Sequence, residues 1–517
     1  MSAAVGRWRT FLHWNPEEAG FWESGGRRHA LRNLLISVPC LLCGFAVWMY
    51  WSIITVQMQN LGFPFTKQQL YTLTSVAGLA GATLRIPSAF LVALSGGRNV
   101  VAATTALLLL PAFGTGVALS RGSTPFSAFV ALAALSGLGG GAFASSMSNI
   151  SFFFPKRVQG AALGVNAGVG NLGVSAMQVL LPFVMTFALF GSLGGDGRAL
   201  PAALGGATRF IQNCGFVWVP ILALLALLAW FGMNNLPQHD AGHPARAIPR
   251  MLWLLLLGFA ATALGLALLL SAGWNMWIVL PTTIVATLLL LRFATTALVR
   301  SGLRRQFAIF RQKHTWVMTW LYVMTFGSFI GYSGAFPKLI QDLFGKLPDG
   351  SINPHAPNPL KYAWLGPLVG SLVRPIGGWL SDRFGGARVT QWDTAAMIAA
   401  ALGVAYCTRL AGAAPDPAPY FTPFLLLFLA LFVTTGIGNG STFRMIPVIF
   451  EPELAGPVLG WTSAVAAYGA FIIPQVFSAQ IAARAPERAF FGFVAYYVTC
   501  LAANWWWYAR RGAERPC

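Results

Sequence analysis

RIPSAFLVALSGGR (residues 85–98) and RPIGGWLSDRFGGAR (residues 374–388) are two stretches of this sequence with the same layout. Each begins with an arginine, has a proline close behind it and ends in a glycine pair followed closely by another arginine. A glycine cluster comes after each stretch, at 137–141 and at 436–440. The two leading arginines are 289 residues apart and the glycine clusters 299 apart, so both features recur in the same order. This pattern predicts an internal repeat of two halves in parallel orientation.

The composition places this repeat in a membrane. Of the 517 residues, 56% are hydrophobic and only 9% are charged, whereas soluble globular proteins carry roughly 25% charged residues. These values exclude a soluble enzyme, a disordered tail protein and a secreted disulfide scaffold. The net charge of +20 does not indicate a nucleic-acid binder, because the basic residues form small clusters separated by long apolar runs.

The apolar runs are long enough to cross a bilayer, which takes about 20 predominantly apolar residues. We count fourteen, and expect each to form a membrane-spanning helix. They lie near 34–56, 70–94, 99–120, 126–154, 158–190, 214–234, 251–271, 276–298, 315–336, 362–381, 389–410, 420–450, 457–477 and 488–508.

Six runs on either side of a central pair predict an all-α polytopic membrane protein with the major facilitator fold, in which two six-helix halves hold the substrate near the middle of the membrane. The extra central hairpin, residues 251–298, is expected to be peripheral and lipid-facing; a dimer contact or a docking surface for a partner is the alternative. The expected divisions are an N-terminal tail over 1–33, a first half over 34–234, a linker over 235–314, a second half over 315–508 and a C-terminal tail over 509–517.

The basic residues predict the orientation of the chain. An even number of spans puts both termini on one side of the membrane. If that side is the cytoplasm, 21 Lys and Arg residues lie in cytoplasmic loops and tails and nine lie on the opposite side. The positive-inside rule therefore predicts cytoplasmic N- and C-termini. Most of the excess positive charge is an orientation signal and requires no anionic partner.

Arg85 and Arg374 lie deep inside apolar runs. A central arginine costs at least roughly 2.5–3.5 kcal/mol to insert, so it usually faces the interior of a helix bundle and marks a transport pathway. By this interpretation all fourteen acidic residues and all six histidines fall in tails, loops or span ends. The expected cavity thus has two permanent cations and no counter-ion.

A planar guanidinium suits a planar oxyanion, because it can donate charge-assisted hydrogen bonds in pairs. We therefore expect a small anion as the substrate. An empty cavity with two unpaired buried cations is costly, which favours exchange of one anion for another over return of the empty carrier. The sequence shows no buried base, nucleophile or metal cluster, so we expect no enzymatic activity, no metal and no cofactor.

Glycines near the two repeated stretches support either close packing or movement of helices. GVNAGVGNLG occupies residues 164–173, and small residues let helices approach closely in membranes. Packing alone is one interpretation. The other is that glycines let helices slide during transport, while Asn171 donates a hydrogen bond to the substrate. The glycines considered for sliding are Gly164, Gly168, Gly170, Gly173, Gly436 and Gly440.

Two long motifs resemble a known family. GAFASSMSNISFFFPKRVQGAALGVNAGVGNLGVS (141–175) closely resembles the first nitrate signature of the NarK-type nitrate/nitrite porters, and GIGNGSTFRMIPVIF (436–450) resembles the second. WNPEEAGFW (14–22), ISVPCLLCGFAVWM (36–49) and FGSFIGYSGAF (326–336) are also similar to this family. The resemblance covers nearly all of the chain except residues 240–300.

The resemblance implies a major facilitator transporter that moves nitrate and nitrite across the bacterial inner membrane. Separately, we expect the protein to function as a monomer. An exchanger of nitrate and nitrite is the expected function. A proton-coupled nitrate symporter is the alternative, because the family also contains such proteins. A membrane sensor or assembly scaffold is disfavoured, since no kinase, nucleotide-binding or partner-domain signature is present.

The resemblance also implies roles for individual residues. One arginine from each half clamps the anion, and these positions match Arg85 and Arg374. The other implied substrate-binding residues are Phe45, Phe143, Asn171, Tyr322, Phe326, Gly438 and Ser441. The chain departs from the family pattern in its central hairpin, at Ala167, and at Asn439 and Arg444 of the second motif.

Overall fold

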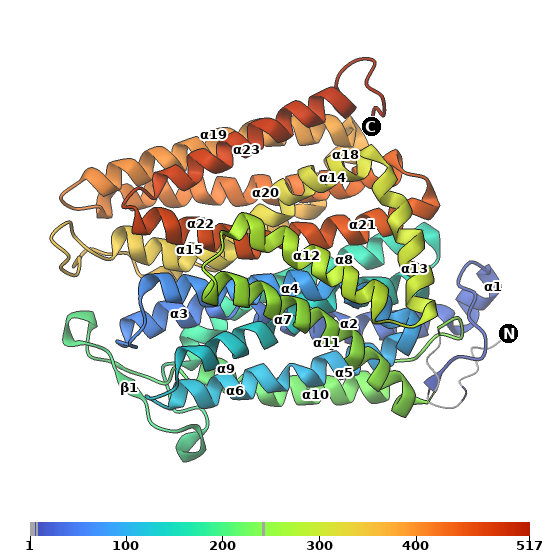
Figure 1. Ribbon diagram of the computed structural model, residues 1–517, viewed down its shortest axis with the longest axis horizontal. Coiled ribbons are helices and arrows are strands. Elements are labelled where there is room, and N and C mark those ends of the chain that lie inside the picture. Colours follow the sequence, from blue (N-terminus) through green and yellow to red (C-terminus); the bar gives the residue numbers. More distant parts are fainter. Residues whose placement is uncertain (1–5, 7–8, 240–242) are drawn as a thin grey trace. The chain divides into compact units, whose positions relative to one another are not determined.

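The computed structural model describes residue 6, residues 9–239 and residues 243–517, and it is almost entirely helical over these ranges (Figure 1). The exception is a two-stranded antiparallel sheet in which Arg198 of β1 (Arg198–Ala199) is opposite Arg209 of β2 (Thr208–Arg209).

The helices follow one another along the chain with short connections. In order they are α1 (Ala19–Phe21), η2 (Trp22–Gly26), α2 (Arg27–Met49), α3 (Trp51–Asn60), α4 (Lys67–Ser95), α5 (Gly97–Leu107), α6 (Leu109–Ser120), α7 (Phe126–Phe153), α8 (Lys156–Val184), η3 (Gly191–Gly194), η4 (Ala202–Leu204), α9 (Asn213–Phe216), α10 (Trp218–Gly232), α11 (Pro244–Leu266), η5 (Ala267–Ser271), α12 (Met276–Phe293), α13 (Ala297–Phe307), η6 (Ala308–Arg311), α14 (Lys313–Tyr322), η7 (Val323–Gly327), α15 (Ser328–Phe344), α16 (Pro359–Tyr362), α17 (Leu365–Leu372), α18 (Arg374–Phe384), α19 (Gly386–Ala413), η8 (Ala418–Tyr420), α20 (Phe421–Ile449), α21 (Pro452–Ala466), α22 (Gly469–Ala482), α23 (Glu487–Asn504) and η9 (Trp505–Ala509).

Eleven helices within the described ranges are long and apolar enough to cross a membrane. The chain is therefore an all-helical polytopic membrane protein, as the sequence predicts. The remaining three of the fourteen expected spans are also helical, but they are less apolar than the eleven. They are α14 to α15, α16 to α18, and α23 with η9. The first contains buried Lys338 and Asp342, and the second is interrupted at Val373.

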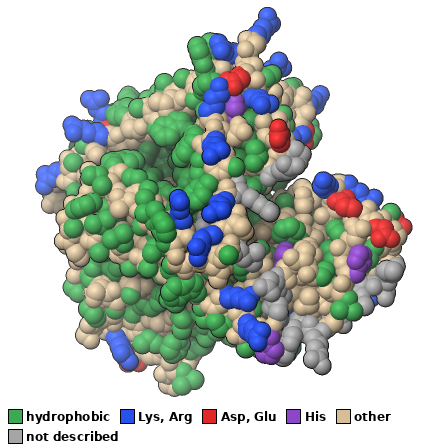
Figure 2. All heavy atoms as spheres, turned by 45° about the vertical axis from the view of Figure 1, so that its right-hand side comes forward, with side chains coloured by type: hydrophobic (Ala, Val, Ile, Leu, Met, Phe, Trp, Pro, Cys, Tyr) green, Lys and Arg blue, Asp and Glu red, His purple; other side chains and the backbone are tan. Residues whose placement is uncertain are grey.

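Many large hydrophobic side chains lie on the outside, as expected of helices that face lipid. Figure 2 shows many hydrophobic side chains, most densely on its left-hand part, together with clusters of Lys and Arg and few acidic side chains. Among the exposed residues are Leu224, Leu227 and Phe231 of α10 and Ile278 and Val285 of α12. The exposed sides of these helices carry large apolar side chains, which supports a position facing lipid.

Contacts divide the chain into two compact units. The first contains residues 1–48, 79–173 and 212–305, and the second contains residues 49–78, 174–211 and 306–517. Two of the divisions fall inside α4 and α8, so each of these two helices contributes one end to each unit.

Glycines bring the helices of the first unit into close contact. A Cβ added to Gly139 of α7 would lie 2.0 Å from the backbone oxygen of Gly44 in α2, and one added to Gly137 would lie 2.7 Å from the backbone nitrogen of Gly81 in α4. No side chain fits at either place. The glycine cluster 137–141 thus fixes α7 directly against the helix that carries Arg85.

The N-terminal WNPEEAGFW segment packs on the ends of α7 and α8. The indole nitrogen of Trp14 donates to the backbone oxygen of Phe152 at 3.2 Å, and the Glu17 carboxylate accepts from the backbone nitrogen of Lys156 at 2.9 Å. Trp14 and Phe21 belong to a buried aromatic cluster with Phe153. This segment holds the start of α8 in place.

The central hairpin packs one of its helices against α4. A Cβ on Gly258 of α11 would lie 2.8 Å from the Leu84 side chain and 3.0 Å from the Pro87 ring, on either side of Arg85 in the sequence. The outer helix, α12, exposes Trp277, among other apolar side chains. The hairpin thus exposes apolar side chains of α12, while α11 packs against the arginine-bearing helix.

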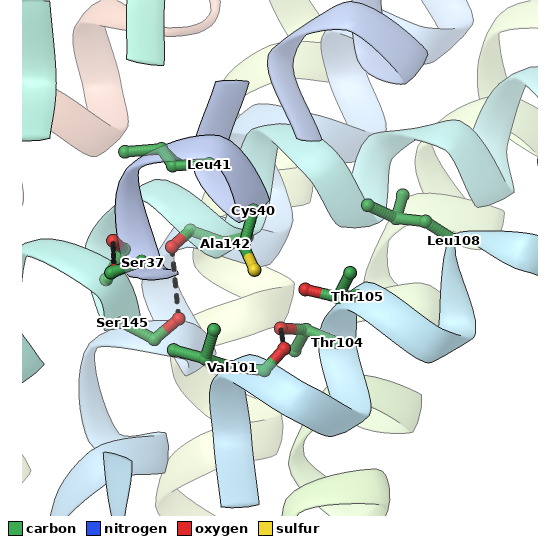
Figure 3. Close-up of a pocket in the computed structure, with 10 residues that line it drawn as sticks. Ser37, Cys40, Leu41, Val101, Thr104, Thr105, Leu108, Ala142 and Ser145 are labelled. Atoms are coloured by element: carbon green, nitrogen blue, oxygen red, sulfur yellow. Dashed lines mark hydrogen bonds between the residues drawn. The ribbon is translucent and has the colours of Figure 1, made fainter. Parts of the chain in front are cut away.

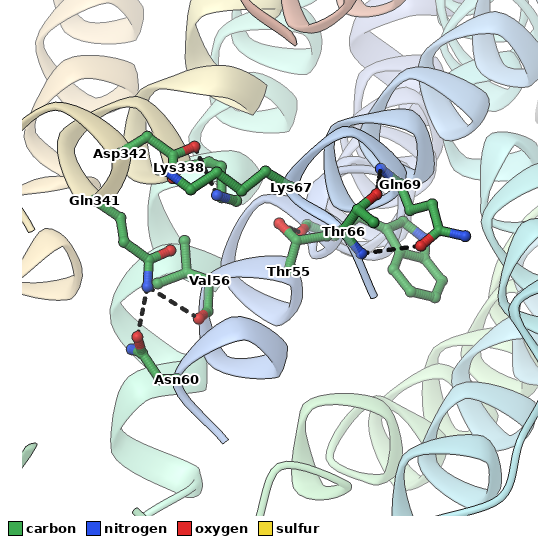
Figure 4. Close-up of polar contacts among 10 residues, drawn as sticks. Thr55, Val56, Asn60, Thr66, Lys67, Gln69, Lys338, Gln341 and Asp342 are labelled. Atoms are coloured by element: carbon green, nitrogen blue, oxygen red, sulfur yellow. Dashed lines mark hydrogen bonds and ion pairs between the residues drawn. The ribbon is translucent and has the colours of Figure 1, made fainter. Parts of the chain in front are cut away.

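In the second unit, α3 and the start of α4 join α15 through polar contacts (Figure 4). The Asp342 carboxylate accepts ion pairs from Lys67 at 3.0 Å and from Lys338 at 2.6 Å, and the Gln341 amide donates to Asn60. The Asp342 side chain is fully buried and that of Lys338 is 2% exposed.

Asp342 lies in the last turn of α15, so it is at the end of a span, as expected. The apolar run ends near residue 336, but α15 continues to Phe344 and buries the side chains of Lys338 and Asp342 together. The two charges are one helical turn apart and neutralise each other, which lets the helix continue through a polar stretch.

Candidate anion-binding site

Arg85 lies on α4 in the first unit and is completely buried. Its Nε donates to the backbone oxygen of Gly140 at 3.0 Å. Its guanidinium carbon is 4.7 Å from the ring centre of Phe143, 5.3 Å from Trp48 and 5.9 Å from Phe45. Three aromatic faces therefore surround the cation, which stabilises it where water is scarce.

Glycines on α4 and α7 make room for one of these aromatic rings, that of Trp48. A Cβ on Gly81 would lie 2.2 Å from the Trp48 indole nitrogen, and one on Gly140 would lie 2.6 Å from the same ring. Trp48 is thus wedged between α4 and α7. The glycine-rich sequence of α7 has a local purpose: it allows a large ring next to the arginine.

Arg374 is the first residue of α18 in the second unit, directly after the break at Val373. Its Nη2 donates to the hydroxyl oxygen of Tyr322 at 3.3 Å, and its guanidinium carbon is 5.5 Å from the ring centre of Phe443. Its Nη1 is buried and has no hydrogen-bond partner among the described residues. A buried donor of this kind can accept an anion.

Phe45, Phe143 and Tyr322 lie beside the arginine of their own half, and Phe326 stacks on Tyr322. Phe45 and Phe143 are 5.9 Å apart edge to face in the first unit, and Tyr322 and Phe326 are 5.9 Å apart and stacked in the second. In each half the guanidinium also lies over a phenylalanine of the glycine-rich helix, Phe143 in α7 or Phe443 in α20. The repeat in the sequence is therefore a repeat in local structure.

Gly438 and Ser441 lie on α20 in a polar layer of the second unit. Ser441 shares a hydrogen bond of 2.8 Å with Thr390 of α19. A Cβ on Gly438 would lie 2.4 Å from Oδ2 of Asp393 and 2.7 Å from the methyl carbon of Thr325. The backbone of Gly438 is thus covered by a carboxyl group.

Asp393 is a correction to the expected positions of the acids. It was expected at the end of a span, near the start of the apolar run 389–410. In the structure it lies two turns inside α19 and is 7% exposed. The candidate site therefore has a buried carboxyl group close to it.

Asn171 and four of the six predicted glycines lie at close helix contacts. Asn171 is 1% exposed, and its Oδ1 has no hydrogen-bond partner in the part of the chain described. Gly170 and Gly173 approach α2, and Gly436 and Gly440 approach α17 and α18. Around Gly164 and Gly168 no atom lies within 4 Å of an added Cβ, so contact does not require glycine there.

A small pocket lies elsewhere in the first unit, between α2, α5 and α7 (Figure 3). Most of its hydroxyl groups already have partners: Thr104 donates to Val100, Ser145 donates to Ala142, and Ser37 and Ser146 share a hydrogen bond of 2.9 Å. It includes neither Arg85 nor any other predicted substrate-binding residue. Since it offers no cation to an anion, we do not assign it to the site.

Sequence reasoning missed three residues beside the predicted ones. Trp48 is one helical turn after Phe45, so helical spacing could have identified it. Phe443 occupies nearly the same place after its glycine cluster as Phe143 does after the first, which the repeat could have shown. Asp393 had no such signal.

Chemically, each arrangement is a fixed cation with an aromatic lining. Such groups can bind and orient a small planar anion, but they supply no base or nucleophile poised to react. Among the described residues there is also no group of three or more His, Cys, Asp and Glu placed to hold a metal ion. The geometry fits recognition rather than covalent chemistry.

Comparison with solved structures identifies the fold. The chain is similar to the nucleoside transporter NupG, with a TM-score of 0.55 at 13% identity over 92% of this chain and 98% of the other. It is also similar to a POT family transporter, with a TM-score of 0.56 at 12% identity over 89% and 94% of the two chains. These likenesses show a major facilitator fold and nothing finer.

Comparison with curated sequences identifies the family. The chain is 39% identical to the probable nitrate/nitrite antiporter NarK2 of Thermus thermophilus, over all of both chains. It is 36% identical to the nitrate/nitrite transporter NarU of Salmonella typhimurium and 35% identical to NarU of Escherichia coli, over 96% of each chain. No protein-family profile matches the chain. From this full-length identity, the chain belongs to the NarK/NarU family of nitrate/nitrite transporters, and it is a membrane transporter rather than an enzyme.

Proposed function

We propose that this protein exchanges nitrate for nitrite by alternating access, with Arg85 and Arg374 binding the anion. Membership of the nitrate/nitrite transporter family supports the substrates. The observation that carries the binding role is the buried Nη1 of Arg374, which has no hydrogen-bond partner among the described residues. A nitrate oxygen satisfies this donor through a charge-assisted hydrogen bond.

The aromatic rings and polar groups complete the proposed site. Phe45, Phe143 and Phe326 present flat faces and edges that exclude water from the anion, and exclusion of water strengthens every charge interaction with it. Tyr322 holds Arg374 in place through its hydroxyl group. Asn171, Gly438 and Ser441 are proposed to contact the substrate, and the glycines at close contacts allow the helices to move past one another.

The proposed topology has fourteen spans, the eleven long apolar helices and the three less apolar ones. Twelve form two six-helix halves, and α11 with α12 is the additional hairpin. We place both termini in the cytoplasm of a bacterial cell, with the protein in the inner membrane and active as a monomer. The excess of Lys and Arg on that side of the membrane supports this orientation.

A proton-coupled nitrate symporter is the second candidate. Asp393 favours it, because a buried carboxyl group next to Gly438 is a group that protons could bind. Exchange remains the first candidate, since two arginines without substrate would be left buried whenever the carrier returned empty.

Counterflow in proteoliposomes distinguishes the two candidates. Vesicles are loaded with nitrite, the pH gradient is removed with an ionophore, and entry of labelled nitrate is followed. Exchange predicts rapid nitrate entry under these conditions. Entry that occurs only with an inward proton gradient would replace exchange by symport, and no entry under either condition would contradict both.

A further inference from the structure

One carboxyl oxygen of Asp393 is buried in the second unit without a hydrogen-bond partner among the described residues. This oxygen is Oδ2, and none of the described residues forms an ion pair with the carboxyl group. Neighbouring polar groups of α19 do have partners: Thr390 bonds Ser441, and Thr394 donates to the sulfur of Met324 at 3.7 Å. Asp393 is therefore the unsatisfied member of this polar face.

The position of the carboxyl group links it to the candidate site. Its Oδ2 packs against Gly438, where even a methyl group would overlap it at 2.4 Å. Thr325 packs on the same spot and shares a hydrogen bond of 3.1 Å with Thr442. Thr325 is one helical turn after Tyr322, which touches Arg374. A change of charge on Asp393 therefore changes the electrostatic potential where the anion is proposed to bind.

An ionised carboxylate in this place would lose its hydration without gaining a cation or a donor. Protonation removes that cost. A negative charge there would also repel an anion beside Gly438, because Coulomb interactions are strong where water is excluded. The neutral acid is compatible with the anion, and the carboxylate is not.

Several charged and titratable groups on the elements packed against α19 are held by partners other than Asp393. None of them contacts the Asp393 carboxyl group in the part of the chain that the structure describes. The pairs are Arg374 with Tyr322, Asp382 of α18 with Arg444 of α20, Tyr497 of α23 with Ser328, and Tyr508 of η9 with His314. The proton on Asp393 therefore does not exchange directly with any of these groups.

We propose that Asp393 is a proton-binding site that controls anion exchange: the protonated acid permits exchange, and the carboxylate blocks it. This inference rests on the proposed function, since it requires an anion at the cluster that contains Gly438. The direction of the pH dependence of exchange follows from this charge. As pH rises, Asp393 loses its proton, a negative charge appears beside the anion and exchange slows.

The test is the pH profile of counterflow in nitrite-loaded vesicles, with the same pH inside and outside, from about pH 5.5 to 8.5. In the wild type, exchange should fall with rising pH, by up to about tenfold per pH unit once Asp393 ionises. In Asp393→Asn, which cannot ionise, exchange should persist at high pH and exceed that of the wild type. A gain of this kind cannot come from misfolding.

A control variant and the neutral state of His239 keep the test specific to Asp393. Asp349→Asn removes an acid from the loop between α15 and α16, and its profile should match the wild type. His239, in the loop after α10, is held neutral over this range, because burial lowers its pKa to about 4. If Asp393→Asn does not fold, Asp393→Glu provides a second measurement, since its longer side chain displaces the acid and should shift the profile along the pH axis.

The outcomes separate this inference from the proposed function. An Asp393→Asn profile that still declines like that of the wild type would overturn the role of Asp393, while exchange itself would stand. An unshifted profile in Asp393→Glu would do the same. Absence of exchange in the wild type at every pH would instead contradict the proposed function.

Discussion

At the scale of single residues, the two arginines of the proposed anion site differ in their contacts. Arg85 and Arg374 are each held by an aromatic ring from the glycine-rich helix of the same half, yet their remaining contacts differ. Arg85 donates to a backbone oxygen of α7, whereas Arg374 donates to the hydroxyl of Tyr322. A backbone contact is fixed, and a side-chain contact can rearrange, so we assign the more adjustable role to Arg374.

Replacing either arginine by lysine should abolish most transport. Lysine keeps the charge but cannot reproduce the planar pair of donors, and a lost charge-assisted hydrogen bond costs about 1.5–3 kcal/mol. We expect counterflow to fall roughly 10- to 100-fold in Arg85→Lys and in Arg374→Lys. The matched control is Arg292→Lys on the exposed side of α12, which should be near normal. Full activity in either site variant would remove that arginine from the site.

Tyr322→Phe should weaken substrate binding without unfolding the protein. The ring and its stacking on Phe326 are kept, while the acceptor for Arg374 Nη2 is lost. The concentration of nitrate at half-maximal exchange should rise by about three- to tenfold, with thermal stability unchanged. Tyr406→Phe, on an exposed side chain of α19, is the control. An unchanged affinity would show that the hydroxyl does not position Arg374.

At the scale of elements, the helices were predictable from apolar periodicity and length, but their buried charges were not. Run length places α4 and α20 within a few residues of their observed bounds. Run length predicts an end of α15 that is too early, because two charged residues, Lys338 and Asp342, are typical of a loop. Their pairing, which allows the helix to continue, is visible only in the structure. Asp393 is misassigned for the same reason: hydropathy averages over a window and does not report which face a carboxyl group takes.

The ion-pair cluster on α15 should stabilise the fold. Asp342→Asn leaves the buried ammonium group of Lys338 without its main partner, and breaking a buried pair costs about 3–5 kcal/mol. The thermal unfolding temperature in detergent should drop, and adding Lys338→Met should restore part of the loss because the stranded charge is gone. Asp349→Asn in the exposed loop should have no effect. Equal stability of Asp342→Asn and the wild type would contradict the contribution of this cluster.

The hairpin should influence transport through α4. Valine at Gly258 would press on Leu84 and Pro87, and overpacking of this kind costs about 1–3 kcal/mol. Because Arg85 lies between these two residues, Gly258→Val should reduce exchange more than it reduces the amount of folded protein. Gly412→Val, where an added Cβ meets nothing within 4 Å, is the matched control. Equal exchange in the two variants would make α11 a passive neighbour of α4.

For the whole molecule, the internal repeat predicts the fold because it pairs a deep arginine with a glycine cluster twice. The structure realises this pairing in both halves: glycines of α7 face α4, and Gly436 and Gly440 face α17 and α18. The contact-based units could not be predicted in the same way. They depend on how α3 and the ends of α4 and α8 pack in three dimensions, and the spacing of apolar residues carries no information about that.

Exchange requires that one anion leaves for each anion that enters, and simultaneous measurement of both fluxes tests this most directly. Nitrite efflux and nitrate influx are recorded together in proteoliposomes with the pH gradient removed. For an obligatory exchanger we expect equal fluxes and no nitrate entry into vesicles that lack an internal anion. Sustained nitrate entry into empty vesicles would contradict obligatory exchange.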